Sequence, residues 1–371
     1  MEAAKPVAMR VAVDARTMGS RPSGVGMYLN DFLKELVNDD AFEFILITDV
    51  ATSEYIKNFE KAGVEVHALG EPIYRSAGVF KYFSYVKKVL DEVQPDIFWE
   101  VNTLIPVHLR GKFRTMITIH DMFPLDYVEY FGKVYSCYFR WALKKTLKNT
   151  DMILYNSEQT KQTTQKHFKE AMHIPNANAY IIAHPLRIKR ELTDEDYFLY
   201  IGNMEKRKGV DLLLKGYKRY REKGGHKRLI LGGKMQEDDI QALLDETMRS
   251  VEGIEYLNYV QHEEKHRLYA ACSCFLFPSK AEGFGMPIIE IMKFHKPVLV
   301  GDLPIYDEIV GDCINRFSLE GSEEEQIEHM SDAMLSYNKT VDEAAYDEVV
   351  SRYEPERLAA IVKDFMLTKI R

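Results

Sequence analysis

Short apolar segments alternate with segments of helical periodicity along this chain of 371 residues, and this alternation restricts the fold more than any other feature. Strands alternating with helices form a mostly parallel sheet whose two faces are covered by helices. In the first half, strands are predicted at residues 10–14, 43–48, 64–68, 97–99, 115–119 and 152–155, and helices at 28–37, 53–62 and 80–93.

The second half repeats the pattern, with strands predicted at 197–201, 228–232, 254–257, 275–277 and 297–300 and a helix at 210–221. A chain of this length exceeds one ordinary hydrophobic core, so two doubly wound α/β domains are expected. Between the halves, residues 184–196 are charged, contain Pro185 and lack an apolar face. We therefore predict domains at 1–185 and 186–354, followed by a helix at 355–371.

The composition narrows the function classes. The chain has no apolar run of the roughly 18–20 residues that a membrane span needs, and Met9–Asp14 is typical of a strand, not of a signal-peptide core. The four cysteines lack metal-ligand or disulfide spacing, which favours a reduced cytoplasm. The net charge of −8 argues against nucleic acid as a partner.

The segment from Pro278 to Glu290 carries the strongest chemical signal. It follows the apolar run Cys274–Phe277 and places Glu282 and Glu290 on either side of a glycine-rich turn that opens a helix. Glycine lets a backbone approach a ligand without an intervening Cβ atom, and amides at a helix start can hold anions. Glu290, eight residues after Glu282, is expected about two helical turns along. A bare pair of glutamates at this spacing is more often part of an ordinary strand–turn–helix with solvated side chains.

Basic and glycine-rich loops follow other predicted strands. The loop after residue 201 contains Asn203, Arg207 and Lys208, and basic side chains at a strand end can neutralise phosphate or simply be solvated. The loop containing Gly24 and Gly26 can offer amides to a phosphate. A dinucleotide fingerprint is disfavoured there because Leu29 takes the third glycine position, although Asp49 ends the next strand.

His120 and Asp121 end the apolar strand at 115–119. A lone histidine at a strand end is more often structural than catalytic. His120 remains a candidate because ligands of open parallel sheets gather at the carboxyl ends of the strands.

The string from Pro278 to Glu290 resembles the E-x7-E signature of retaining family-4 glycosyltransferases, whose GT-B fold has two Rossmann-like domains separated by an interdomain cleft. The resemblance runs from about Met9 to residue 371. It implies that Glu282 contacts hydroxyls of the donor sugar, that Glu290 contacts the nucleotide ribose, and that the amides between them hold sugar and diphosphate. It also implies that the last helix crosses back to the first domain.

The resemblance assigns roles to further residues. Lys208 aligns with a family lysine that neutralises the donor diphosphate, with Arg207 adjacent; many members have an arginine where this chain has Asn203, so neutralisation rests on the other two. His120 is expected beside the transferred sugar, and together with Glu282, Lys208 and Arg207 it forms the predicted catalytic set. The implied donor- and nucleotide-binding residues are Gly24, Gly26, Asn203, Gly233, Tyr259, Val260, Gly283, Phe284, Gly285, Met286, Pro287 and Glu290.

Residues 118–131 resemble mannosyltransferases of bacterial surface-polysaccharide assembly. The implied reaction is metal-independent, retaining transfer of a hexose to a hydroxyl of a glycan or a polyprenol-linked saccharide, with no cofactor. GDP-mannose is the first expectation for the donor, followed by UDP- or dTDP-sugars. No Asp-x-Asp in the chain is suited to a metal–diphosphate, so lysine, arginine and amides are expected to replace a metal.

Three alternatives stay open. A sugar-nucleotide 2-epimerase shares the fold but needs no acceptor. A non-catalytic partner subunit would usually have lost one signature glutamate, and this chain has both. A nicotinamide dehydrogenase is disfavoured by Leu29.

Two stretches, 73–90 and 127–148, mix aromatic with basic side chains. Such helices either direct their aromatics into the core or lie on an anionic bilayer. The second alternative places the protein peripherally at the inner face of the plasma membrane.

Overall fold

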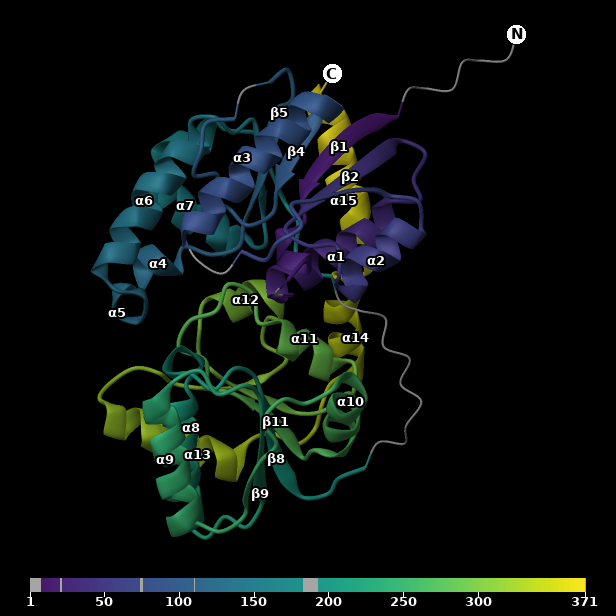
Figure 1. Ribbon diagram of the computed structural model, residues 1–371. Helices are drawn as coiled ribbons and strands as arrows, with labels where there is room; N and C mark the ends of the chain where they lie inside the picture. The colour runs from purple at the N-terminus through teal and green to yellow at the C-terminus, as the bar shows by residue number, and fades with distance from the viewer. Residues whose placement is uncertain (1–7, 21, 74–75, 110, 183–192, 371) are drawn as a thin grey trace. The chain divides into compact units, whose positions relative to one another are not determined.

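The computed structural model describes residues 8–20, 22–73, 76–109, 111–182 and 193–370 (Figure 1). Two compact units are formed, the N-terminal unit (residues 1–182 and 353–371) and the C-terminal unit (residues 183–352). The last helix therefore belongs to the unit that contains the beginning of the chain. Most of the predicted linker, 184–196, lies outside the described residues.

The N-terminal unit is built on a parallel sheet of seven strands in the order β3-β2-β1-β4-β5-β6-β7. In the middle of this sheet, Val13 of β1 pairs with Leu46 of β2 on one side and Trp99 of β4 on the other. The strand order thus reverses direction between β1 and β4. The strands are β1 (Met9–Asp14), β2 (Phe42–Thr48), β3 (Glu65–Ala68), β4 (Ile97–Glu100), β5 (Arg114–Ile119), β6 (Met152–Tyr155) and β7 (Asn176–Asn178).

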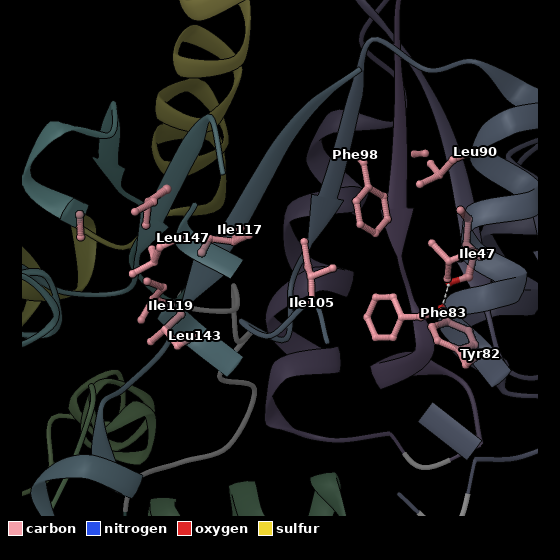
Figure 2. Packing of buried hydrophobic residues seen from close by; sticks show 14 of the residues in the cluster. Ile47, Tyr82, Phe83, Leu90, Phe98, Ile105, Ile117, Ile119, Leu143 and Leu147 are labelled. Atoms are coloured by element: carbon pink, nitrogen blue, oxygen red, sulfur yellow. Dashed lines mark hydrogen bonds between the residues drawn. The ribbon is translucent and has the colours of Figure 1, made fainter. Parts of the chain in front are cut away.

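Helices cover both faces of this sheet. On one face, Tyr82, Phe83 and Leu90 of α3 and Leu143 and Leu147 of α6 pack with strand residues in a dry core (Figure 2). On the other, α1 packs beside α15. The helices of eight or more residues are α1 (Gly24–Leu36), α2 (Glu54–Lys61), α3 (Ser76–Val93), α6 (Lys133–Leu147), α7 (Glu158–His167) and α15 (Pro355–Ile370); the shorter ones are η1 (Arg16–Met18), α4 (Phe123–Asp126), α5 (Val128–Phe131) and η2 (Lys169–His173).

The C-terminal unit contains a six-stranded parallel sheet in the order β10-β9-β8-β11-β12-β13. Its strands are β8 (Tyr197–Ile201), β9 (Arg228–Gly232), β10 (Ile254–Tyr256), β11 (Cys274–Phe277), β12 (Val298–Gly301) and β13 (Asn315–Phe317). Its helices are η3 (Lys206–Lys208), α8 (Val210–Glu222), α9 (Asp238–Ser250), α10 (His262–Ala271), α11 (Met286–Met292), α12 (Ile305–Ile309), α13 (Glu323–Ser336) and α14 (Glu343–Ser351).

Two doubly wound parallel sheets confirm the predicted fold class. The sequence patterns missed the edge strands β7 and β13, which are only three residues long and each begin with asparagine. An edge strand pairs on one side only, so backbone pairing forms it without an apolar run.

Within the described residues, no helix combines the length and the apolar character that crossing a membrane requires.

Candidate functional site

The predicted residues of the C-terminal unit follow four strands that are neighbours in the sheet, β10, β9, β8 and β11. Because these strands are parallel, the loops after them leave the sheet at one edge. In doubly wound sheets this carboxyl edge is where ligands bind.

Lys208 and Glu282 form the centre of this edge. The Lys208 Nζ atom lies 2.6 Å from Glu282 Oε1, and the two side chains are 17% and 7% exposed. The ammonium group also lies 5.5 Å from the centre of the Phe277 ring. The ion pair is nearly enclosed yet retains contact with solvent, so an incoming polar ligand can compete for either group.

Hydrogen bonds hold the loop after β8 against the loop after β11 around this pair. The Arg207 guanidinium donates to the Ala281 carbonyl at 3.2 Å, and the Lys280 amide donates to the Arg207 carbonyl at 2.9 Å. Gly209 has φ +69°, and a Cβ atom there would lie 2.0 Å from the Pro278 carbonyl oxygen. Glycine is thus required for the basic loop to reach the Pro278–Glu290 segment.

Gly233 and Val260 pack the neighbouring strand ends. A Cβ atom on Gly233 would lie 1.7 Å from the Gly202 carbonyl oxygen, and the Gly233 amide donates to Asn258 at 2.6 Å. Val260 fits against Gly232. These positions bring the loops after β8, β9 and β10 into contact, while Tyr259 is 74% exposed. Asn203 is exposed, and its carbonyl accepts a hydrogen bond from Tyr200.

Glu290 lies apart from this pair and has its own partners. Lys265 Nζ lies 3.0 and 2.9 Å from its two carboxylate oxygens, and the Tyr269 hydroxyl donates to Oε2 at 3.0 Å. The side chains of Lys265 and Glu290 are 15% and 13% exposed. Sequence reasoning missed both partners; their spacing of four residues on α10 was the available signal, because it places them on one helix face.

The predicted two helical turns between Glu282 and Glu290 are wrong. Gly285 adopts φ +95° and α11 begins only at Met286, so Glu290 lies about one turn into the helix. Gly283, Phe284 and Pro287 belong to this turn or to the first turn of α11. The left-handed conformation at Gly285 interrupts the helical path that the spacing assumed.

Two hydroxyl groups beside this turn, those of Ser279 and Tyr306, are buried and have no hydrogen-bond partner among the residues that the structure describes. Burial and, less strongly, the charge of Glu282 raise the pKa of Tyr306 well above its usual value. The Tyr306 phenol therefore stays protonated and is a hydrogen-bond donor near Glu282. Sequence reasoning did not select it, because it lies on α12 after the next strand.

In the N-terminal unit, His120 is partly buried at the end of β5. Its Nε2 atom lies 2.9 Å from the Val101 carbonyl oxygen, and its ring meets Tyr28 edge-on at a centroid distance of 5.0 Å. Burial lowers the pKa of His120 to about 4, against a weaker opposing effect of the Val101 hydrogen bond. The imidazole is therefore neutral near pH 7 and donates to the carbonyl, which leaves Nδ1 as its acceptor atom.

Gly24 and Gly26 were predicted in a loop before a helix starting at Tyr28, but they lie in the first turn of α1. Ser23 caps this helix, and its hydroxyl accepts the Gly26 amide at 3.3 Å. A Cβ atom on Gly26 would lie 2.1 Å from the Thr17 carbonyl oxygen, whereas Gly24 has open space. Gly26 therefore serves close packing of α1 on η1, and its amide already has a partner.

A buried charge cluster that sequence reasoning missed lies where the strand order reverses between β1 and β4. Arg16 lies 3.3 Å from both Asp14 and Glu100, whose side chains are fully buried. The Tyr82 hydroxyl donates to Asp14 at 2.6 Å. Burial, followed by the charge of Asp14, raises the pKa of Glu100 well above its usual value. One cation thus lies between two carboxyl groups away from water.

Asp49 was considered in the rejected dinucleotide-binding hypothesis. Its carboxylate is already hydrogen-bonded within the protein. It accepts hydrogen bonds from the amides of Ser20 and Val50 at 3.1 and 2.8 Å.

No candidate metal site occurs in the part of the chain that the structure describes. It contains no group of three or more His, Cys, Asp or Glu side chains that could hold an ion.

Comparison with known families matches both halves of the chain. The family described as glycosyltransferase family 4 matches residues 22–187, and the family described as glycosyl transferases group 1 matches residues 186–347. The two matches adjoin near the start of the C-terminal unit.

Among curated relatives, O-antigen chain mannosyltransferase B of Escherichia coli is 33% identical over 215 residues, which cover 54% of this chain and 56% of that protein. The match thus spans little more than half of that relative's length. O-antigen chain mannosyltransferase RfbU of Salmonella typhimurium is 23% identical over 359 residues, covering 90% of this chain and 95% of the relative.

Solved structures share the fold at low sequence identity. Sucrose-phosphate synthase of Thermosynechococcus elongatus gives a TM-score of 0.74 at 14% identity, covering 97% of this chain and 98% of the other. Anabaena HepE, solved in complex with UDP-glucose, gives 0.72 at 15% identity, covering 97% and 100%. Both resemble this chain over both units.

Proposed function

Because the chain belongs to the family-4 glycosyltransferases of the GT-B fold, we propose that it transfers a hexose from a nucleotide-diphosphate sugar to a hydroxyl group of a glycan acceptor. The proposal depends most on one observation, the partly solvated Lys208–Glu282 ion pair at the carboxyl edge of the second sheet. In it, a cation for the diphosphate and an acceptor for sugar hydroxyls lie in direct contact.

The donor breaks the Lys208–Glu282 ion pair and gives each residue a new partner. Its diphosphate binds the Lys208 ammonium group, and the hydroxyls of its sugar bind the Glu282 carboxylate. Each group can change partners because the donor supplies a replacement, a diphosphate charge for Lys208 and hydroxyl donors for Glu282, so neither group is left buried without a partner. Arg207 lies in the same locked loop and adds a second positive charge.

The nucleotide end of the donor binds beside Glu290 and the loops after β9 and β10. Glu290 accepts the ribose hydroxyls, with Lys265 and Tyr269 holding its carboxylate in place. Gly233, Tyr259 and Val260 face the base. Gly283–Pro287, including Phe284, Gly285 and Met286, contact the sugar and diphosphate, and Asn203 lies beside the diphosphate.

The transfer retains the configuration of the anomeric carbon. The bond from that carbon to the diphosphate oxygen breaks, and the acceptor oxygen bonds to the same face while its proton passes to the leaving diphosphate. Lys208 and Arg207 stabilise the charge that develops on the leaving group. In the N-terminal unit, His120 positions the sugar and the acceptor through its Nδ1 atom.

The reaction uses no metal ion. The positive charge that a metal would supply comes from the basic loop. An Asp-x-Asp spacing does occur at Asp194 and Asp196, but these carboxylates bond to Ser273 and Lys227 at the opposite end of β8.

GDP-mannose is the proposed donor, because two of the relatives are named as O-antigen chain mannosyltransferases. UDP- and dTDP-sugars rank next, and Anabaena HepE was solved with UDP-glucose. The proposed acceptor is a saccharide or a polyprenol-linked saccharide, reached from the cytoplasm through peripheral contact with the inner face of the plasma membrane.

A direct assay tests this proposal. The purified chain is incubated in EDTA with GDP-mannose, UDP-glucose or dTDP-glucose and with lipid-linked or free saccharide acceptors, and products are identified by mass spectrometry and by the anomeric coupling in NMR. We expect an elongated acceptor with the donor's anomeric configuration. Conversion of the sugar nucleotide without an acceptor would instead indicate an epimerase, and an inverted product would refute retention.

A further inference from the structure

The outward side of α6 carries an unusual set of exposed apolar side chains. Val134 is 88% exposed, Trp141 57%, Tyr135 45% and Tyr138 39%. Val134, Tyr138 and Trp141 follow at spacings of four and three residues, so they form one stripe along the helix. We call this side, with its cations, the α6 outer face; its members are Lys133, Val134, Tyr135, Tyr138, Arg140, Trp141, Lys144, Lys145 and Lys148.

The opposite side of α6 is already packed. Phe139, Leu143 and Leu147 are buried in the core of the N-terminal unit. The exposed aromatics therefore do not belong to this core, and they contact each other, with centroid distances of 6.3 Å for Tyr135–Tyr138 and for Tyr138–Trp141. They form a continuous aromatic surface in place of scattered single residues.

The charge on this face has one sign. The helix and the residue that follows it contain five cations and no acidic side chain. Among the ion pairs between described side chains, none includes a cation of the α6 outer face; Lys145 instead lies 5.3 Å from the Trp141 ring. Of the acids in the preceding segment, Asp126 of α4 pairs with His167. Asp121 lies before α4, and its charge adds to the effect of burial in raising the pKa of Tyr135.

The other aromatic and basic stretch behaves differently, although its composition is similar. Tyr82 and Phe83 of α3 are fully buried, and Lys81 and Lys88 pair with Glu71 and Glu92. Only Phe80 is a large exposed apolar side chain on this helix; Tyr74 lies outside the described residues. Of the two stretches, α6 has the larger set of exposed aromatics, and none of its cations forms an ion pair with a described acid, whereas on α3 only Lys87 lacks one.

We propose that the α6 outer face docks on an anionic lipid bilayer. Tyrosine and tryptophan favour the headgroup level because one end of each ring system is apolar and the other polar. Lysine and arginine around such a stripe gain from anionic headgroups, at roughly 1 kcal/mol for each cation near the surface. This inference deepens the membrane contact proposed above and rests on it, but it fails independently of sugar transfer, because α6 contains none of the proposed donor-binding residues.

Tryptophan fluorescence gives a direct measurement, because the chain has only two tryptophans. Trp99 is fully buried, with its N–H donating to Thr118 at 2.9 Å, and serves as an internal reference. The whole chain is titrated with vesicles of phosphatidylglycerol and phosphatidylethanolamine, and with vesicles of phosphatidylcholine alone. We expect a blue shift and protection from acrylamide only with the anionic vesicles, and loss of both changes in Trp141→Phe.

Flotation of the same vesicles quantifies binding. Replacing Lys144 and Lys148 by glutamate is expected to weaken binding at least about tenfold, and Tyr138→Ser with Trp141→Ser to weaken it further. The matched control reverses two exposed cations elsewhere in the unit, Lys34→Glu with Lys61→Glu, and is expected to bind nearly as the parent does. Transfer to a short water-soluble acceptor should stay unchanged in all of them.

Several results would overturn the proposal. These are no binding to anionic vesicles, equal binding to phosphatidylcholine, or equal loss in the control pair. A Trp141 blue shift that depends on protein concentration without lipid would assign the face to a second copy of the chain. A shift with a soluble saccharide alone would assign it to a glycan.

Discussion

The carboxyl edges of the two sheets have the same topology but hold their charged groups in different ways. In the C-terminal unit, Lys208–Glu282 and Lys265–Glu290 are ion pairs whose side chains keep between 7% and 17% of their surface in contact with solvent. In the N-terminal unit, Asp14 and Glu100 are fully buried around Arg16. Both carboxylates of the first edge keep some contact with solvent, whereas those of the second have none, although Arg16 between them is 12% exposed.

This difference has a physical consequence. A ligand can approach a pair that water still reaches and can take the place of one partner. A buried pair cannot exchange partners in this way, because removing one charge leaves the other in a medium of low dielectric. The first arrangement suits ligand binding and the second fixes the loops around η1, so the same edge of the same fold serves two purposes.

The largest effect is expected for Arg16→Met, which removes the cation of the buried cluster in the N-terminal unit. The substitution leaves two carboxyl groups buried without their cation, which is expected to lower the free energy of unfolding by about 3–5 kcal/mol. Urea titration followed by tryptophan fluorescence reports on this unit, because it contains both Trp99 and Trp141. Arg10→Met, which removes a surface pair with Glu43, should cost less than about 1 kcal/mol; equal losses would contradict the distinction.

Replacing Lys208 by methionine tests the replaceable side. We expect the turnover number to fall by about 10²–10³, because the developing negative charge on the leaving diphosphate loses its nearest cation. The neighbouring Lys280, whose Nζ atom lies 2.7 Å from Asp211, supplies the control Lys280→Met. If the two variants showed the same turnover, the central role of Lys208 would have to be abandoned.

Glu282→Ala is likewise expected to act mainly on turnover.

Glu290→Ala separates binding from turnover at the same edge. The loss of the proposed ribose contacts is expected to raise the dissociation constant of the nucleotide about tenfold, or about 1.4 kcal/mol, in a calorimetric titration. Lys265→Met should reproduce part of this effect by releasing the Glu290 carboxylate, with rescue by Lys265→Arg. Glu263→Ala, an exposed carboxylate on the same helix as Lys265, is the control, and unaltered affinity in Glu290→Ala would place the nucleotide elsewhere.

The last prediction concerns His120 and acid pH, and it leaves stability near pH 7 unaffected. Burial lowers its pKa to about 4 in the folded chain, below the roughly 6.5 of an unfolded histidine. The folded state therefore binds fewer protons than the unfolded state between these values, and the contribution of His120 to stability is lost as the pH falls from about 6.5 towards 4. An NMR titration of the ring should show a midpoint near 4. A midpoint above 6 would refute this account.

The sequence predicted the fold and the Pro278–Glu290 segment because both depend on local patterns. Apolar runs before loops locate β8 and β11, and Gly209 and Gly285 provide the left-handed backbone that the turns need. Lys208 could be selected for the same reason, since it follows a strand end. Its contact with Glu282 required knowing that β8 and β11 are neighbours.

The residues that the sequence did not reveal act through long-range pairing. Arg16 and Glu100 are 84 positions apart and meet only because β1 pairs with β4. Lys265 and Glu290 are 25 positions apart and meet through packing of α10 against α11. The α3 and α6 stretches have similar compositions, and only the tertiary packing shows that the aromatics of one are buried and those of the other exposed.

Residues 353–371 have a consequence for how the protein is made. The ribosome finishes the entire C-terminal unit before it adds α15, whose Lys363 pairs with Asp39 and whose preceding Tyr353 meets Tyr180 at a centroid distance of 5.7 Å. During synthesis, the surface of α1 that α15 covers stays open until residues 355–370 have been made. The first half of the nascent chain therefore waits for α15 before its unit is complete.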